Sequence, residues 1–542
     1  MDQLDQLIDT VLTEDAQSES EDLFNAISSL AKLSREEETV RNRLASEKVL
    51  YRLMVILATR MRTPPEADLL AATLRCVGNA CVSNPEACKL VTQFKFDWYY
   101  VFLVSKEVEL RPFQRLPDRT PASTKGWALS RANRLSPHWD APPAEIRELT
   151  IKVLYNICSQ SEEAQKLCYI AGVDIQLFHV LGDYDRSPVE NPSLAIDLLF
   201  WITSHHQELC KDQDAKLSHT NNAGDVLSRS FWTTILEATH LLWDKVDVED
   251  YATLLESMLV FLRDPEASNE NQDDARRLPS IWRILTRVER KIQQANEDAE
   301  DVKLLAALST SLTWVLSDIS ASTGFAFHVT ANARDTMRPF IEDLSQLLTT
   351  GVALSRPEMR WSLDDVDEII DGDALRLTSA ACQIVGNMLH GQASSEEHLD
   401  DDRIKALYQP ILSTSTNSEQ PLAVQDRHIY HRLFALMTTS DNADFLHSAA
   451  GFLIQLSRPT PEVRAEIASD NNALAAIKRL GQHPMQQLNQ DALMLMRSLG
   501  KDTPSVQEKL KELAGEVMAT VAETQKAAAD AQTEQAAITS TV

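Results

Sequence analysis

An eight-residue pattern of apolar and polar positions recurs along the chain, and each copy predicts one buried face of an α-helix. A small or apolar residue comes first and an aliphatic residue usually follows. A second aliphatic residue lies four positions after the first, and a polar or aromatic residue comes two positions later. Apolar positions three to four apart form a stripe along an α-helix. The copies begin at Ala26, Thr73, Thr150, Ala195, Leu312, Ala381, Ala449 and Ala492.

The seventh position of each copy forms a column that we call the ladder. Three of its members are asparagines, which are poor helix formers because their amides compete for backbone hydrogen bonds. If the helices stack, each amide either bridges to the neighbouring helix or stays free for the backbone of a ligand. The ladder residues are Lys32, Asn79, Asn156, Trp201, Asp318, Asn387, Gln455 and Ser498.

Several copies are preceded by a second segment that indicates a short helix, a break and an amphipathic helix. Such segments occupy residues 44–57, 167–181 and 467–480. Gly172 is the break in the clearest of them, because glycine tolerates the positive φ that lets two helices meet at a sharp angle. The succession of a short helix, a second helix and the eight-residue pattern on a third helix resembles the armadillo repeat family.

In that family, units of about 40–47 residues stack into a right-handed superhelix whose third helices line a concave groove. The resemblance therefore implies an all-α, armadillo-type solenoid. Its repeats are irregular, because successive ladder residues lie 47, 77, 45, 117, 69, 68 and 43 positions apart. A further copy near Ser257 would place Arg263 in the ladder within the longest gap. An irregular all-helical protein with coincidental periodicity is the alternative.

The composition agrees with a helical solenoid. With 44% hydrophobic residues and only 14 glycines, the chain favours a large helical core over sheets with tight turns or glycine-rich phosphate loops. We expect one solenoid over residues 1–522. Residues 523–542 have helix-forming side chains but no apolar face, so we expect them to form a disordered tail.

The cysteines and the N-terminal residues indicate where in the cell the protein is located. The seven cysteines are scattered among apolar helical positions, which is typical of buried thiols in a reducing compartment rather than of a disulfide framework. The acidic N-terminus does not fit a secretory signal, and the chain has no run of about 18 uncharged apolar residues that would predict a transmembrane segment. These features favour a cytoplasmic location.

The formal net charge of −28 disfavours nucleic acid and anionic membrane surfaces as partners and favours a cationic one. Acidic side chains also cluster in sequence. One run extends from Asp364 to Asp373 and includes Asp365, Asp367 and Glu368. Each such run is ordinarily a solvated loop, but beside a concave groove the acidic balance makes a basic peptide or tail the expected class of ligand.

Residues 105–143 reverse the sign of the charge and carry six prolines among basic and aromatic residues. Prolines at this density preclude a continuous helix. We expect a long basic loop inserted into the solenoid, which accounts for the 77-residue spacing in the ladder. The loop docks on an acidic partner, folds back on the acidic face of the protein itself, or is a plain disordered insertion.

The chain contains no phosphate-binding loop, nucleophile elbow or paired metal motif. We therefore predict no catalytic residues, no metal site and no cofactor, and a chain that is not an enzyme. His205 and His206 are adjacent and would face different sides of a helix, which does not suit a shared metal. We expect Trp201, a ladder residue, to face the groove and Trp314 to lie in the core.

Two sequence segments point to a particular family of armadillo proteins. "TLRCVGNACVSNPEACKLV" at residues 73–91 and "ACQIVGNMLHG" at residues 381–391 place glycine before the ladder asparagine. They are similar to phrases of the small-GTPase dissociation stimulator family, whose members are almost pure armadillo arrays. The resemblance implies binding of Rho- or Ras-type GTPases with basic, prenylated tails. It also implies that the chain promotes nucleotide release or chaperones the GTPase.

Carried over by motif, the resemblance places the partner contacts on the ladder and the acidic run. The expected contacts are Asn79, Asn156, Trp201, Asp318, Asn387 and Gln455, with Asp364, Asp365, Asp367 and Glu368 facing the basic tail. Two alternatives remain. A karyopherin-like adaptor also reads basic peptides, but such arrays pair tryptophan with the ladder asparagine one turn later, a pairing that this chain lacks. An ataxin-10-like or cytoskeletal scaffold would leave nucleotide exchange unchanged.

Overall fold

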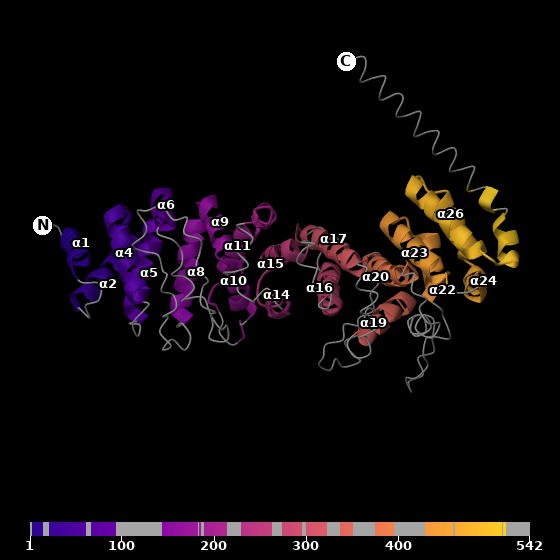
Figure 1. The fold of residues 1–542 in the computed structure, drawn as a ribbon, viewed down its shortest axis with the longest axis horizontal. Coiled ribbons are helices and arrows are strands. Elements are labelled where there is room, and N and C mark those ends of the chain that lie inside the picture. The colour runs from indigo at the N-terminus through magenta and orange to yellow at the C-terminus, as the bar shows by residue number, and fades with distance from the viewer. Residues whose placement is uncertain are drawn as a thin grey trace, which may run out of the picture. The chain divides into compact units, whose positions relative to one another are not determined.

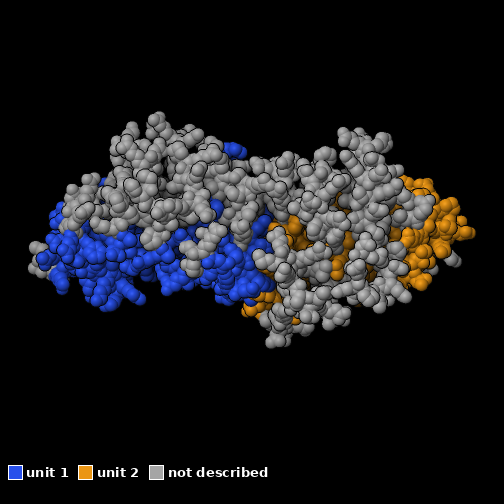
Figure 2. All heavy atoms as spheres, turned by 90° about the horizontal axis from the view of Figure 1, so that it is seen from below, with its two compact units in different colours: residues 1–267 blue, residues 268–542 orange. Residues whose placement is uncertain are grey.

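The structure is a computed structural model in which the chain forms two compact units, Met1–Ala267 (unit 1) and Ser268–Val542 (unit 2), coloured blue and orange in Figure 2. Its described residues form α-helices joined by turns and contain no β-strand (Figure 1). The predicted all-α fold class is therefore confirmed. A single right-handed solenoid over residues 1–522 stays a prediction. The described residues are 3–14, 21–60, 67–93, 144–182, 184–185, 189–213, 229–262, 274–294, 300–321, 337–350, 374–394, 429–458, 461–511, 513–515 and 517.

All eight copies of the sequence pattern lie in helices. We call these eight helices the ladder helices, together with α15, which contains Ser257 of the further expected copy. In unit 1, α2 packs on α5, α5 on α8, α8 on α11 and α11 on α15. In unit 2, α17 packs on α20, α20 on α23 and α23 on α26. The ladder helices are α2 (Glu21–Glu36), α5 (Ala67–Cys81), α8 (Ala144–Cys158), α11 (Pro192–Thr203), α15 (Val248–Leu262), α17 (Glu300–Ala321), α20 (Ala374–Ser394), α23 (Ala443–Leu456) and α26 (Gln486–Gly500).

The remaining helices each precede a ladder helix along the chain. In unit 1 they are α1 (Gln3–Thr13), α3 (Glu38–Leu44), α4 (Glu47–Arg60), α6 (Pro85–Gln93), α9 (Glu162–Ile170), α10 (Val173–Gly182), α12 (His206–Leu209) and α14 (Arg229–Leu242). In unit 2 they are α16 (Asp274–Gln294), α19 (Met337–Thr350), α22 (Ile429–Thr439), α24 (Pro461–Ala468) and α25 (Ala473–Gly481).

Complete three-helix repeats occur where the sequence predicts a short helix, a break and a second helix. They are α3–α4–α5, α9–α10–α11 and α24–α25–α26. Gly172 lies between α9 and α10 with φ of 78°, a conformation that side chains other than glycine disfavour. At the start of α9, the Ser161 hydroxyl accepts a hydrogen bond from the Ala164 N–H at 3.2 Å, which satisfies one unpaired donor of the first turn. The predicted break is therefore confirmed.

Glycine before a ladder asparagine allows two ladder helices to approach closely. A Cβ atom at Gly78 would lie 3.1 Å from the Cγ2 atom of Val153 on α8. Apolar side chains from both helices fill the space around this contact, and Leu74, Val77 and Leu154 are fully buried. The glycine thus serves helix packing, a role that any close stack of helices requires.

Arginines stabilise the second-helix layer by a route that the sequence did not reveal. Arg52 on α4 donates from Nε to the Val11 carbonyl at the end of α1, at 3.0 Å. Arg432 on α22 donates to the Leu347 carbonyl at the end of α19, at 3.2 Å. Arg479 on α25 donates in the same way to the last carbonyls of α22. Each guanidinium satisfies carbonyls that have no partner in their own helix and complements the negative end of the helix dipole.

Helix α17 is long and apolar enough to cross a membrane by length and hydropathy alone. It begins with Glu300 and Asp301 and packs against α16 and α20, and 44% of its apolar window is buried. Those contacts are typical of a core helix in a helical stack.

Candidate functional site

The ladder asparagines of unit 1 bridge each ladder helix to the one before it. Asn79 donates from Nδ2 to the Ala31 carbonyl at 3.3 Å and to the Ser34 hydroxyl at 2.9 Å. Asn156 donates from Nδ2 to the Gly78 carbonyl at 3.2 Å. In both cases the carbonyl belongs to the residue immediately before the ladder position of the preceding helix. Because a carbonyl can only accept, the amide nitrogen must face it and the orientation of the amide is fixed.

Unit 2 repeats this geometry at the same offset. Asn387 donates from Nδ2 to the Ser317 carbonyl at 3.0 Å and to the Ser320 hydroxyl at 3.1 Å. Ser498 donates to the Ile454 carbonyl at 3.3 Å. The sequence left two roles open for the ladder polar groups, a bridge to the neighbouring helix or a contact with a ligand. The bridge is present in both units. Contact with a partner stays a prediction.

The three ladder asparagines are half-buried. Within the described part of the chain, their Oδ1 atoms accept no hydrogen bond, and they are not among the fully buried atoms that lack a partner. The amide nitrogen of each asparagine is therefore used inside the stack, whereas its oxygen stays on the solvent side.

Trp201 replaces the amide bridge with an aromatic contact. Its indole lies against the ring of Tyr155, with ring centroids 4.9 Å apart and planes inclined by 41°. Tyr155 is the residue immediately before the ladder position of α8, so the contact occurs at the same offset as the asparagine bridges. Both rings are half-buried, so each keeps an exposed edge or face on the ladder side of unit 1.

Three carboxylates lie on the helices next to this aromatic pair. Asp197 lies one turn before Trp201 on α11, and Glu249 and Asp250 begin the neighbouring helix α15. Burial raises the pKa of Asp197, and the charges of Asp250 and Glu249 raise it further. Burial, and to a smaller extent the Asp197 charge, raises the pKa of Tyr155. We call Tyr155, Asp197, Trp201, Glu249 and Asp250 the α11 patch.

The charge of the α11 patch is not compensated within the described residues. There, no basic side chain forms an ion pair with its three carboxylates; Asp250 accepts a hydrogen bond from the Ser193 hydroxyl. Lys152, which lies one turn before the ladder position of α8, forms ion pairs with Glu148 at 3.4 Å and with Glu190 at 3.6 Å. The patch is thus an aromatic and negatively charged surface that suits a cation.

Unit 2 carries a second aromatic and acidic pair on α17. Trp314 is 67% exposed, so the expectation that it lies in the core is wrong. The buried stripe of α17 includes Leu308, Leu312 and Leu316, and a residue two positions from Leu312 falls on the opposite side of the helix. Asp318, the ladder residue one turn later, is also exposed. We call Trp314 and Asp318 the α17 pair.

The position occupied by Trp314 in the pattern forms a strip of mixed polarity on the consecutive ladder helices of unit 2. Gly451 occupies this position on α23, and no atom lies within 4 Å of the place its Cβ would take. Met494 occupies it on α26 and is 56% exposed. Gln383 on α20 completes the strip and donates to the Ser448 hydroxyl at 2.9 Å.

The structure places the predicted contacts in two groups. Asn79, Asn156 and Trp201 lie on consecutive ladder helices of unit 1, and Asp318, Asn387 and Gln455 lie on consecutive ladder helices of unit 2. The predicted contacts Asp364, Asp365, Asp367 and Glu368 lie outside the described residues. The same is true of Arg263, the insertion at 105–143 and the tail at 523–542.

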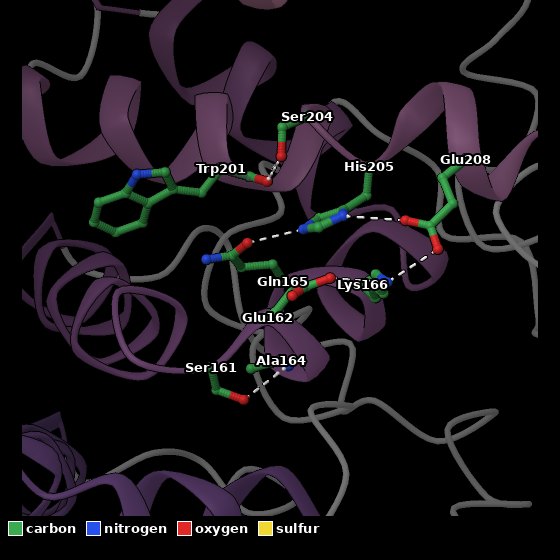
Figure 3. Close-up of polar contacts among 9 residues, drawn as sticks. All are labelled: Ser161, Glu162, Ala164, Gln165, Lys166, Trp201, Ser204, His205 and Glu208. Atoms are coloured by element: carbon green, nitrogen blue, oxygen red, sulfur yellow. Dashed lines mark hydrogen bonds and ion pairs between the residues drawn. The ribbon is translucent and has the colours of Figure 1, made fainter.

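Sequence reasoning missed two features of unit 1. It did not group Asp197 with Glu249 and Asp250, because the acids come from helices far apart in sequence. It also missed a cluster at the end of α11, where His205 meets Glu162 of α9 and Glu208 of α12 (Figure 3).

The prediction that His205 and His206 face different surroundings is confirmed. The His206 Nδ1 atom lies 2.7 Å from the Tyr169 hydroxyl inside the core, whereas the His205 Nδ1 atom lies 3.7 Å from a Glu208 carboxylate oxygen. The two imidazoles therefore cannot ligate one ion together.

The chain matches no protein-family profile and no curated protein sequence. Among solved structures, it is similar to an engineered protein at 14% identity, with a TM-score of 0.34 over 92% of this chain and 99% of that one. It is also similar to a chain of the SYS-1/POP-1 crystal complex at 11% identity, with a TM-score of 0.36 over 94% of this chain and 88% of that one. At such low TM-scores, these likenesses support no inference about function.

Proposed function

We propose that this chain is a non-catalytic scaffold whose ladder faces bind a basic segment of a protein partner. The observation that carries the proposal is the combination of aromatic rings and uncompensated carboxylates in the α11 patch and the α17 pair. A lysine or arginine side chain gains from both at once, because the ring face attracts the cation and the carboxylate pairs with it. The Oδ1 atoms of the ladder asparagines supply acceptors for the N–H groups of an extended backbone.

The partner that we propose is a small GTPase of the Rho or Ras type with a polybasic, prenylated tail. The net charge of −28 supports this class because it attracts such a tail over the distance at which proteins first meet. The resemblance of residues 73–91 and 381–391 to the dissociation stimulator family supports it as well. In this proposal the scaffold binds the nucleotide-free GTPase more tightly than the loaded one, which promotes release without any chemistry of its own.

A fluorescent-nucleotide release assay against a panel of Rho and Ras GTPases tests the proposal. We expect faster release from at least one GTPase and a loss of binding when its basic tail is deleted. Trp314→Ala should weaken binding about fivefold, since a cation–π contact contributes about 1 kcal/mol at an exposed site. Met485→Ala is the matched control, because Met485 is 49% exposed but precedes α26 and is not part of the ladder face.

The result that would refute the GTPase proposal is a panel in which no member binds at micromolar protein. If a GTPase binds equally well without its tail, the role given to the aromatic and acidic groups is wrong.

A second candidate is an adaptor, karyopherin-like or ataxin-10-like, that binds basic peptides or cytoskeletal partners without affecting nucleotide exchange. The exposure of Trp314 one turn before the ladder residue Asp318 favours it, because this pair recognises a basic side chain without a folded GTPase. The two functions separate when an isolated basic peptide is titrated. Full affinity for the peptide, together with no acceleration of nucleotide release, identifies the adaptor. A cytoplasmic location belongs to both proposals, and cell fractionation tests it.

A further inference from the structure

Three potential ligand groups for a metal ion meet at the C-terminal end of α11. Glu162 opens α9, Glu208 lies on α12, and His205 precedes α12 directly (Figure 3). One donor atom from each residue lies within 4.8 Å of the other two. Donor atoms on one tetrahedral ion with bonds of about 2.0–2.2 Å lie about 3.4 Å apart, so rotations of the two exposed glutamate side chains would bring the three groups onto a single ion.

The tautomer of His205 is set by a chain of hydrogen bonds behind it. The Nε2 atom of Gln165 donates to the Cys158 carbonyl at 2.6 Å, so the amide oxygen of Gln165 must point the other way. That oxygen lies 2.8 Å from the His205 Nε2 atom, which must therefore carry the hydrogen. In the neutral ring, the Nδ1 lone pair then faces the Glu208 oxygen 3.7 Å away. Metal-ligating histidines are oriented in this way, by donating their other N–H to a fixed oxygen.

A cation already lies between the two carboxylates. The ammonium of Lys166 is 3.0 Å from an oxygen of Glu162 and 3.0 Å from an oxygen of Glu208 (Figure 3). The long, flexible side chain of Lys166 is 29% exposed, so the ammonium can leave for solvent when another cation takes its place.

We propose that Glu162, His205 and Glu208 bind a divalent transition-metal ion of the zinc class, in competition with the ammonium of Lys166. One imidazole nitrogen and two carboxylate oxygens form a mixed donor set that suits Zn²⁺ better than Mg²⁺ or Ca²⁺, which prefer oxygen alone. Bound there, the ion links the first helix of one repeat to the first helix of the next. It would stiffen the end of α11 one turn beyond Trp201.

The test is a titration of the chelator-treated full chain with Zn²⁺ alone, measured by calorimetry and by competition with a chromophoric chelator. We expect the wild type to bind one equivalent of Zn²⁺ that His205→Ala lacks. Glu208→Gln should lose the same equivalent. Because the Glu208 side chain is 63% exposed, this second variant removes a ligand without disturbing the core. Lys166→Met should bind the equivalent about tenfold more tightly, because it removes a positive charge next to the dication.

The chain offers a matched control for the lysine variant. Lys152 also lies between two carboxylates, those of Glu148 and Glu190, but no histidine belongs to that group. Lys152→Met should leave Zn²⁺ binding unchanged. Equal stoichiometry in the wild type, His205→Ala and Glu208→Gln would overturn the proposal, as would Lys166→Met binding no more tightly than the wild type. Circular dichroism confirms that each variant is folded.

Discussion

Replacing Asn387 tests whether the ladder asparagines are structural bridges. Its amide nitrogen donates to the Ser317 carbonyl at 3.0 Å and to the Ser320 hydroxyl at 3.1 Å. Each hydrogen bond contributes about 1 kcal/mol net. Alanine recovers about 0.6 kcal/mol because it is a better helix former. We therefore expect Asn387→Ala to lower the free energy of unfolding of unit 2 by about 1–1.5 kcal/mol.

Asn387→Asp is the sharper variant because it keeps the shape of the side chain. It removes both donors and places a negative charge next to the Ser317 carbonyl oxygen, which is itself an acceptor. We expect it to cost about 1 kcal/mol more than the alanine variant, although aspartate is the natural ladder residue at position 318. The two variants should lower the melting temperature by about 3 °C and about 6 °C respectively.

Differential scanning calorimetry of the full chain measures these shifts directly, since a two-unit chain need not unfold in one step. Asn471→Ala is the control, because Asn471 is exposed between α24 and α25 and should change stability by less than about 0.5 kcal/mol. An Asn387→Asp chain that melts at or above the temperature of Asn387→Ala refutes the bridging role. Introducing Ser320→Ala into the wild type and into Asn387→Ala completes a double-mutant cycle. This cycle measures the coupling energy between Asn387 and Ser320.

Other variants probe the second-helix layer, the exposed tryptophan and one titrating pair. Arg432→Met should destabilise the chain by about 2 kcal/mol, because the carbonyls at the end of α19, including that of Leu347, lose a charged donor. Urea unfolding measures this loss of stability. Arg432→Lys should lose less stability than Arg432→Met, since it keeps a charged donor. Trp314→Ala should change the melting temperature by less than 2 °C or so, because the side chain is mostly exposed, and a larger loss would contradict a binding role. The hydrogen bond to Asp491 raises the pKa of His447, so its stabilisation is complete below the ordinary value of about 6.5 and is lost as pH rises through the raised value. Between pH 6 and about pH 9, the melting temperature of the wild type should therefore fall more than that of His447→Gln. If the two plots of melting temperature against pH run parallel, the linkage between His447 protonation and stability is refuted.

Features encoded within one helix could be predicted from the sequence. The eight apolar stripes specify the ladder helices, because side chains three and four apart must share a face. The break at Gly172 follows from the conformational freedom of one residue. A poor helix former that is repeated at one position needs a compensating contact. The sequence therefore limited the ladder asparagines to two roles, a bridge to the neighbouring helix or a contact with a ligand. The exposure of Trp314 was also predictable, because the stripe through Leu312 and Leu316 excludes it.

Features that join distant segments could not be predicted. Arg52 and Arg432 find their carbonyl acceptors 41 and 85 positions away, and nothing local distinguishes a capping arginine from a solvated one. The α11 patch needs α15 to lie beside α11, which in turn depends on how many residues the intervening helices contain. His205 is 40 positions from Gln165, which orients it. These contacts depend on which helices stack on one another. Because the repeat length is irregular, the sequence does not indicate which residues of neighbouring helices lie opposite each other.

The same contacts explain why charge alone does not define the binding surface. At physiological salt the Debye length is about 8 Å, so most of the net charge of −28 acts on the encounter with a partner and little on the bound state. Basic side chains such as Arg432 and Lys152 are engaged within their own unit, which leaves Asp197 and Asp318 without a described cationic partner. In the proposed function, a basic segment therefore gains affinity only where an uncompensated carboxylate lies beside an accessible ring, and both units provide such a place on a ladder helix.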